Sequence, residues 1–338
     1  MLTIDGSFGE GGGQILRSSL ALSAVTGTPF RIERIRANRS KPGLKRQHLT
    51  AVLAAAEVCS AQVDGAMLGS TRVEFSPGEV RAGNYRFAIG TSGSTSLVLQ
   101  TVLPPLLRAP APSTVILEGG THNPFAPPFD FLERVFVPLV ERLGPRVRLE
   151  LERPGFVAAG GGRLRAVVSP AATLRGFELL ERGKTRRRHA RALVANLPRH
   201  IAERELDVLR KRLGWPPECF EIVEVADSAG PGNVVMVEIA SEHVTEIVTA
   251  FGEVRRPAET VARDAVRQAC RYLDATAPVG EHLTDQLLLP LALAGSGGFR
   301  AIGLSRHATT HIELIRKFLA IEIRVEPLDD GEVIVRVG

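Results

Sequence analysis

The stretch GEGGGQILRSSLALS, residues 9–23, sets three consecutive glycines in front of an apolar helical run. Two later stretches have the same form, a turn of small or polar residues followed by an apolar helix: GTSGSTSLVLQTVLPPLL at 90–107 and VGEHLTDQLLLPLALAG at 279–295. Each copy of such a pattern is one supersecondary unit that needs neighbouring copies to bury its apolar face. The three stretches therefore predict a repeat architecture.

A second predicted helix follows each stretch, at residues 41–61, 126–144 and 309–320. Alternating, strand-like sequence accompanies these helices, as in RVRLELERP at 146–154 and IEIRVEP at 321–327. Two helices packed on a small sheet make a stable two-layer unit. The sequence predicts an α+β fold in which three repeated units, each of two helices and a four-stranded sheet, form a large domain.

Residues 181–277 have a different pattern from the three repeats. A basic strand-like run at 182–198 is followed by a helical segment at 202–215, strands at 220–227 and 234–241, and a helix at 256–274. The last residues of the chain have too few strands to close a core alone, so they must complete a unit begun earlier. We therefore expect a small α/β domain, 181–277, inserted into a large domain formed by 1–180 and 278–338. The basic run Lys184 to Arg191 could guide RNA or simply face water.

Composition is that of a globular protein, with 44% hydrophobic and 23% charged residues. Neither a membrane span nor a signal peptide is evident, so a cytoplasmic location is expected. Three widely spaced cysteines indicate no disulfide framework. The net charge of +5 favours an anionic partner. Because aromatic residues make up only 5% of the chain, a sheet that stacks several bases is disfavoured and phosphates should dominate any contact with nucleic acid.

The glycine-rich turn at 9–14 is compatible with anion binding, although it lacks the Lys-Ser/Thr of a P-loop. Consecutive glycines before a helix allow backbone N–H groups to approach an anion, and Glu10 could hold a divalent cation that bridges phosphates. A tight structural turn explains the glycines equally well. The segment IRANRSKPGLKRQH at 35–48 favours the anion site, because its cations have no acidic neighbour in sequence.

Two histidines stand four residues apart in LSRHATTHIELIRKFL at 304–319. A zinc protease pattern would need a Glu where Ala308 stands. Thr310 and Glu313 have the spacing of a capping box, which predicts that the helix begins after His307 and separates the two imidazoles. A neutral imidazole beside an anion site could attack phosphate, whereas a solvated loop histidine would have no such role.

Seven segments strongly resemble, in the same order, those of RNA 3'-terminal phosphate cyclases. They are DGSFGEGGGQILRSSLALS, IRANRSKPGLKRQHLTA, YRFAIGTSGSTSLVLQTVLP, GGTHNPFAPPFDF, GPGN, VGEHLTDQLLLPLALAG and RHATTHIELIRKFL. The resemblance spans essentially the whole chain. It implies three α+β repeats with an inserted α/β domain. It also implies ATP-dependent conversion of an RNA 3'-phosphate to a 2',3'-cyclic phosphate, through a covalent histidine-AMP and an RNA-adenylate.

The resemblance also implies roles for individual residues. His307 matches the nucleophilic histidine, and Glu10 matches a glutamate that contacts the divalent metal, Mg or Mn. Residues expected to hold the RNA terminal phosphate or the phosphates of ATP are Arg17, Arg36, Arg39 and Gln47. Residues expected to contact the nucleotide are Gln100, Pro127, Phe131, His282, Leu283, Thr284, Asp285 and Gln286.

Two positions depart from the family pattern. His311 stands where an asparagine is usual, and His282 stands where a tyrosine is common. Three alternatives remain: a non-catalytic relative that binds RNA or a ribosome-assembly partner, an adenylylase acting on 5' or DNA phosphate ends, and an enolpyruvyl transferase of similar build. Retention of His307 and the arginines argues against the first, and the histidine motif argues against the last.

Overall fold

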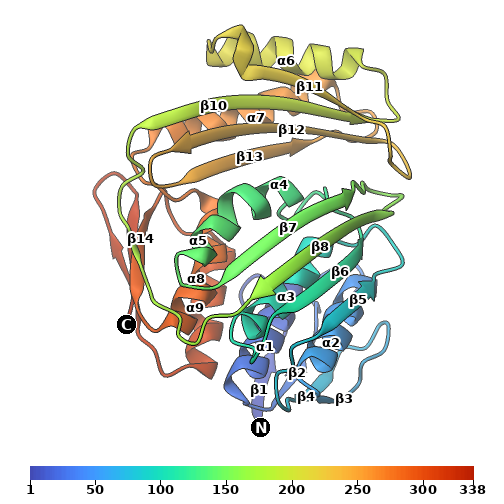
Figure 1. Cartoon of the computed structure of the whole chain (residues 1–338), viewed down its shortest axis with the longest axis vertical. Helices are drawn as coiled ribbons and strands as arrows, with labels where there is room; N and C mark the ends of the chain where they lie inside the picture. The colour runs from blue at the N-terminus through green and yellow to red at the C-terminus, as the bar shows by residue number, and fades with distance from the viewer.

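The computed structural model describes all residues, 1–338, as a mixed α/β protein with four sheets of four strands each (Figure 1). The first sheet has the order β1-β2-β4-β3. Its strands and the two helices between them are β1 (Leu2–Asp5), α1 (Gly13–Thr26), β2 (Phe30–Glu33), α2 (Arg46–Val58), β3 (Gln62–Asp64) and β4 (Val73–Ser76). The glycine-rich turn thus leads from the edge strand β1 directly into α1.

The second sheet has the order β5-β6-β8-β7. Its elements are β5 (Asn84–Ala88), α3 (Thr95–Leu106), β6 (Ser113–Gly119), α4 (Phe129–Phe131), the π-helical turn η1 (Leu132–Phe136), α5 (Val137–Glu141), β7 (Arg146–Arg153) and β8 (Gly162–Ser169). The helix predicted at 126–144 is therefore one helical run interrupted by a π turn. Ser94 caps α3, because its side chain accepts a hydrogen bond from the backbone N–H of Leu97.

The third sheet, in the order β15-β16-β14-β9, joins strands from two separate parts of the chain. Its elements are β9 (Glu178–Leu179), α8 (Glu281–Ala294), β14 (Gly297–Ala301), α9 (Arg306–Phe318), β15 (Ile323–Pro327) and β16 (Val333–Val337). The short strand β9 pairs in parallel with β14, through Gly298 opposite Glu178 and Phe299 opposite Leu179. The chain therefore leaves this sheet after β9 and returns to it about a hundred residues later.

The intervening residues form the fourth sheet, in the order β11-β10-β12-β13 (Figure 1). The elements are β10 (Thr185–Ala195), α6 (His200–Leu213), the short turn η2 (Pro217–Cys219), β11 (Phe220–Val225), β12 (Gly232–Ser241), β13 (Thr245–Phe251) and α7 (Ala258–Asp274). Both faces of this sheet are buried. Val235, Val237 and Ile239 join a separate apolar cluster with α6 and α7, whereas Val234 and Met236 join the main core.

The main core is a single cluster of 68 buried apolar residues, organised around the helices that follow the glycine- or serine-rich turns. Helix α1 packs against α3 and α9, and α8 packs against α9, so these helices lie together between the first three sheets (Figure 1). Leu16, Leu20 and Leu22 of α1 have no exposed surface. No helix combines the length and the apolar character needed to cross a membrane.

The basic run at Lys184–Arg191 lies on β10 and is largely neutralised by carboxylates. Arg186 pairs with Glu242, and Arg187 pairs with Glu238. Arg191 Nη2 lies 2.6 Å from Asp130 Oδ1, at the contact between β10 and α4. Most of the positive charges that made this run a candidate for guiding RNA are therefore paired with carboxylates of the protein itself.

Glu246 connects β13 to the start of α8 and makes stability dependent on pH. Its carboxylate accepts a hydrogen bond of 2.9 Å from the Gly280 N–H, and burial raises the pKa of Glu246 to about 7. The unfolded carboxyl titrates near 4.5, so the folded protein binds the extra proton between these two values. We expect the free energy of unfolding to fall by about 3 kcal/mol as the pH rises through this window.

Denaturant unfolding of the wild type and Glu246→Gln across this pH range measures the effect. The amide keeps the acceptor but cannot titrate, so the variant should show a shallower pH dependence. Part of the slope should remain, because burial also raises the pKa of Glu205 to about 7. Identical slopes for the two proteins would show that Glu246 does not titrate in this window.

Candidate active site

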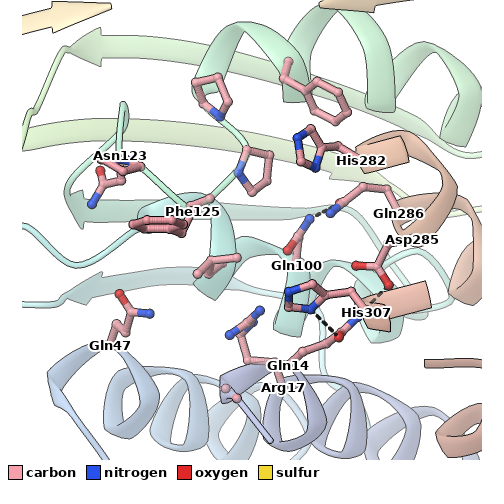
Figure 2. A pocket seen from close by; sticks show the side chains of 18 of the residues that line it. Gln14, Arg17, Gln47, Gln100, Asn123, Phe125, His282, Asp285, Gln286 and His307 are labelled. Carbon is pink, nitrogen blue, oxygen red and sulfur yellow. Dashed lines mark hydrogen bonds between the residues drawn. The ribbon is translucent and has the colours of Figure 1, made fainter. Parts of the chain in front are cut away.

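A cavity of about 1240 Å³ lies where the three glycine- or serine-rich turns meet. Each turn contributes lining residues: Gly12 and Gly13 before α1, Ser92 and Gly93 before α3, and Glu281 and His282 at the start of α8. The three turns that predicted the repeats therefore also line one cavity. Figure 2 shows the side chains that point into it.

Most of the residues expected at the site do line this cavity. They are Glu10, Arg17, Arg36, Arg39, Gln47, Gln100, Pro127, Phe131, His282, Asp285, Gln286 and His307. Leu283 and Thr284 do not line it: both have no exposed surface, and the Thr284 hydroxyl donates to the Gly280 carbonyl at 2.9 Å. In a helix, positions 282, 285 and 286 share one face, so the two residues between them turn toward the core.

The predicted start of the last helix is wrong, and the difference changes the position of His307. Helix α9 begins at Arg306, because the Ser305 side chain accepts a 3.2 Å hydrogen bond from the Ala308 N–H and caps it. Thr310 caps nothing, since its hydroxyl donates to the Arg306 carbonyl at 2.7 Å. His307 therefore lies in the first turn of α9, and His311 follows one turn later.

A hydrogen-bonded chain sets the tautomer of His307 (Figure 2). Gln14 Nε2 donates to Asp285 Oδ1 at 2.6 Å, which orients the amide so that Gln14 Oε1 faces His307 Nδ1 at 3.0 Å. Because Oε1 can only accept, the proton of a neutral His307 must be on Nδ1. The Nε2 atom is then left with a free lone pair in the cavity, as a nucleophile requires.

His311 is buried and braces the same carboxylate. Its Nδ1 donates to Asp285 Oδ1 at 3.0 Å, and its Nε2 accepts from the Ser18 hydroxyl at 3.1 Å. With both ring nitrogens occupied, His311 is unavailable as a metal ligand beside His307. No group of three or more His, Cys, Asp or Glu side chains in the chain is arranged to hold a metal ion. The interpretation of the His307–His311 spacing as a zinc site therefore has no support.

The electrostatics of the site keep His307 neutral. Burial lowers the pKa of His307, the charges of Arg17 and Arg39 lower it further, and Asp285 acts in the opposite direction. Burial by itself would raise the pKa of Asp285, but His311 and the hydrogen bond from Gln14 outweigh it, so that pKa lies below its ordinary value. A neutral imidazole thus adjoins an ionised carboxylate.

The glycines at the N-terminus of α1 allow other side chains of the site to lie close to the helix backbone. A side chain at position 13 would collide with His48 Nε2 at 2.4 Å and Arg17 Nη1 at 2.9 Å. Gly12 supplies no side-chain cap, so the first N–H groups of α1 are not satisfied by a capping side chain. Burial lowers the pKa of Arg17 to about 10, which still leaves its guanidinium charged at neutral pH beside these N–H groups.

The other two arginines have internal partners that the sequence did not suggest. Arg39 forms an ion pair with Glu10, whose Oε1 also lies 3.9 Å from His307 Nε2. Arg36 is only 6% exposed, and its Nη1 donates to the carbonyls of Lys41 at 2.6 Å and Gly43 at 2.9 Å. The expectation that this basic cluster lacks an acidic partner is therefore wrong for Arg39, and Arg36 also shapes the loop.

Two glutamines connect the walls of the cavity. Gln47 Oε1 accepts from the Ser94 N–H at 3.1 Å, which joins α2 to the start of α3. Gln100 of α3 donates to Gln286 of α8, where Figure 2 shows them near His282. The side chains expected to bind phosphate thus lie near α1 and α2, and amide and ring side chains lie between α3 and α8.

The sequence that forms this cavity matches that of a known family. A model of the family described as RNA 3'-terminal phosphate cyclase matches residues 8–325. The chain belongs to the RNA 3'-terminal phosphate cyclase family. The chain is 54% identical to the RNA 3'-terminal phosphate cyclase of Koribacter versatilis over 325 residues, covering 96% of this chain and 92% of the relative.

Other curated relatives carry the same name. The Ralstonia nicotianae RNA 3'-terminal phosphate cyclase is 53% identical, covering 98% of this chain and 96% of the relative. The Salmonella typhimurium protein of that name is 49% identical, covering 100% of this chain and 99% of the relative. The solved enolpyruvyl transferase NikO from Streptomyces tendae is 12% identical, with a TM-score of 0.28 over 99% of this chain and 64% of that chain, too low to carry any argument.

In this cyclase-family chain, sequence reasoning missed Gln14 and the bracing role of His311. Neither the glycine-rich turn nor the family resemblance assigned a role to Gln14. Its position one residue after three glycines, at the start of a helix aimed at the anion site, was a usable signal. The partnership of His311 with Asp285 joins residues 26 positions apart, and no local pattern indicates it.

Proposed function

We propose that this protein converts the 3'-terminal phosphate of RNA into a 2',3'-cyclic phosphate and consumes ATP in doing so. The observation that carries the proposal is the hydrogen bond of 3.0 Å between His307 Nδ1 and Gln14 Oε1, which leaves His307 Nε2 free to act as a nucleophile in the cavity. Membership of the RNA 3'-terminal phosphate cyclase family supports the substrate and the co-substrate.

In the first step, His307 Nε2 attacks the α-phosphorus of ATP. A bond forms between Nε2 and phosphorus, and pyrophosphate leaves with the electron pair of the broken P–O bond. The imidazole then carries AMP, and its Nδ1 proton remains hydrogen-bonded to Gln14. Asp285, which orients Gln14, stabilises the positive charge that develops on the ring.

The phosphate groups would be held at the α1 side of the cavity. Arg17 and Arg39 supply positive charge, the first N–H groups of α1 supply hydrogen bonds, and Arg36 and Gln47 shape the wall. The nucleoside would lie on the opposite side, against Gln100, Pro127, Phe131, His282, Asp285 and Gln286. Leu283 and Thr284 would support that side indirectly, by packing α8 into the core.

In the second step, an oxygen of the RNA 3'-phosphate attacks the phosphorus of the histidine-AMP and releases the imidazole. The terminal phosphate is then linked to AMP through a phosphoanhydride, so it has acquired a leaving group. The adjacent 2'-hydroxyl attacks the terminal phosphorus, loses its proton to solvent, and expels AMP. Because that hydroxyl belongs to the same ribose, proximity supplies much of the rate.

Glu10 is the residue that would hold a divalent cation, Mg or Mn. Its side chain is 12% exposed and is paired with Arg39. Mg²⁺ is usually bound by one or two carboxylates together with substrate phosphates, which fits a site with one carboxylate beside a phosphate pocket. Such a cation neutralises charge on the transferring phosphoryl group when bound.

The domain plan that we infer follows the connections of the sheets. Residues 1–180 and 278–338 would form the large domain of three repeated units, and residues 181–277 would be an insertion. The separate apolar cluster around α6 and α7 supports the insertion. The pairing of β9 with β14, on either side of the inserted residues, supports it as well.

The test uses ATP labelled on the α-phosphate and an RNA oligonucleotide that carries a 3'-phosphate. We expect a covalent protein label that is stable to alkali and lost in acid, and transfer of the label to AMP when the RNA is added. The RNA end should become resistant to phosphatase. RNA with a 5'-phosphate and DNA with a 3'-phosphate serve as comparison substrates. Failure of the folded protein to accept label, with no pyrophosphate released, would contradict the proposal.

The lowered pKa of His307 predicts how labelling depends on pH. Only the neutral imidazole is nucleophilic, so the rate should fall as the pH drops through the pKa of His307. Because burial lowers that pKa, the acid limb of the labelling rate should lie below about 6.5, the ordinary histidine value. Single-turnover labelling at ATP concentrations well below saturation measures it, because that rate reports the pKa of the free protein. An acid limb at or above the ordinary value would contradict the assignment.

A further inference from the structure

Phe125 is the most exposed large apolar side chain of the protein, and it lines the active-site cavity. Its exposed fraction is 101%, and its backbone φ is 63°, a left-handed conformation that bulky residues rarely adopt. Neither the nucleotide contacts nor the phosphate contacts proposed above use this ring. An aromatic residue that an unfavourable backbone conformation holds in solvent indicates a site that binds another molecule.

The loop that carries Phe125 is firmly anchored, so the exposed ring is not the tip of a loose segment. Asn123, on one side, donates its amide N–H to the Ser92 carbonyl. On the other side, the Ser96 hydroxyl donates to the Pro127 carbonyl at 2.6 Å. Prolines at 124, 127 and 128 restrict the backbone further. The ring is therefore presented from a fixed position.

The ring lies on the side of the cavity away from the proposed nucleoside contacts His282 and Gln286. Figure 2 shows Phe125 with Asn123 and Gln47 on one side, and His282 with Gln286 on the other. Val157 is a second exposed apolar residue that lines the cavity, at 50% exposure. Its neighbour Phe156 forms a β-bridge with His122, which brings the two loops together. An apolar lip, Phe125 and Val157, thus lines the same cavity as the arginines.

We propose that Phe125 is a stacking platform for the base of the 3'-terminal nucleotide of the RNA. This inference rests on the proposed cyclase function and adds a contact to it. A nucleotide end presents a charged phosphate and, about one ribose away, an apolar base face. The cationic pocket and the apolar lip match these two features. Aromatic stacking accepts every base, so the contact favours a terminal base without selecting a sequence.

The experiment compares Phe125→Ala and Phe125→Trp with the wild type on two RNA oligonucleotides with 3'-phosphates. One has a normal terminal nucleotide, and the other has an abasic terminal ribose. On the normal RNA, Phe125→Ala should lower kcat/KM on the order of 10-fold, as expected for the loss of one base–aromatic stack. Phe125→Trp should retain the wild-type value. On the abasic RNA, the three proteins should be equal, because no base is present to stack.

Two controls separate this inference from the proposed function. Met67→Ala removes another exposed apolar side chain, 68% exposed and outside the cavity, and should match the wild type on both RNAs. Protein labelling by α-labelled ATP, without RNA, reports the histidine step alone and should survive in Phe125→Ala. An unchanged kcat/KM for Phe125→Ala, or an equal loss on both RNAs, would overturn the stacking role. Absence of cyclisation by the wild type would remove the function and this contact with it.

Discussion

Replacement of His307 by alanine is expected to abolish protein labelling by α-labelled ATP and all cyclisation of RNA 3'-phosphates. The side chain supplies the Nε2 that forms the covalent bond, and no second nucleophile lies in the same position. Loss of a nucleophile typically reduces the rate on the order of 10⁴-fold or more. Denaturing gel analysis after incubation with labelled ATP and a divalent metal measures this directly.

The matched control is His200→Ala, which removes an exposed histidine from α6, far from the cavity lining. It should label like the wild type. RNA that has been adenylylated beforehand at its 3'-phosphate should bypass the defect of His307→Ala. Closure of that intermediate needs no histidine nucleophile, so the variant should still form the cyclic end. Acid-labile label on folded His307→Ala would refute the assignment of the nucleophile.

Asp285→Asn should be the next most damaging change, although it alters only one atom of the carboxyl group. Asp285 Oδ1 accepts both hydrogen bonds, from Gln14 and from His311. An asparagine keeps one oxygen, but it loses the negative charge that stabilises the developing imidazolium, and its NH₂ group competes for the position of Oδ1. With the NH₂ group in that position, the asparagine donates to Gln14 and turns that amide around. The Gln14 NH₂ group would then face His307 Nδ1 and move the imidazole proton to Nε2. Blocking a nucleophilic or basic nitrogen in this way costs on the order of 10²- to 10⁴-fold in rate.

Gln14→Ala distinguishes this tautomer effect from simple loss of a contact. Without Gln14, His307 is free to adopt either tautomer, so the labelling rate should fall less than in Asp285→Asn, by about 10-fold. Both rates must be measured at saturating ATP, because Asp285 also lines the nucleotide side of the cavity. A larger loss in Gln14→Ala than in Asp285→Asn would contradict the orientation mechanism.

The sequence predicted the parts of the site that depend on local pattern. The three glycine- or serine-rich turns were identified from self-similarity, and the structure places all three at one cavity. The cationic segment at 35–48 was identified from charge alone, and Arg36, Arg39 and Gln47 line that cavity. Mixed α/β character followed from periodicity and is confirmed.

The sequence did not predict the parts that depend on long-range contacts. Thr310 has the spacing of a helix cap, but Ser305 caps α9, because Thr310 is held by Arg306 and by the Glu10 N–H. The choice between two possible caps is made by packing against a turn 300 residues away.

The exclusion of Leu283 and Thr284 from the cavity lining, in contrast, was predictable from the sequence. Helical geometry alone separates these two residues from the face of His282 and Asp285.

The hydrogen bond between Gln14 and His307 joins residues 293 positions apart, and this sets when the protein can first become reactive during its synthesis. At ordinary translation rates, roughly 15 to 60 s separate the appearance of the two residues. Throughout that interval, Gln14 and Ser18 on α1 lack the partners that α8 and α9 later provide. On the proposed mechanism, a nascent chain on the ribosome therefore carries the proposed anion-binding turn long before it carries His307, and cannot trap AMP prematurely.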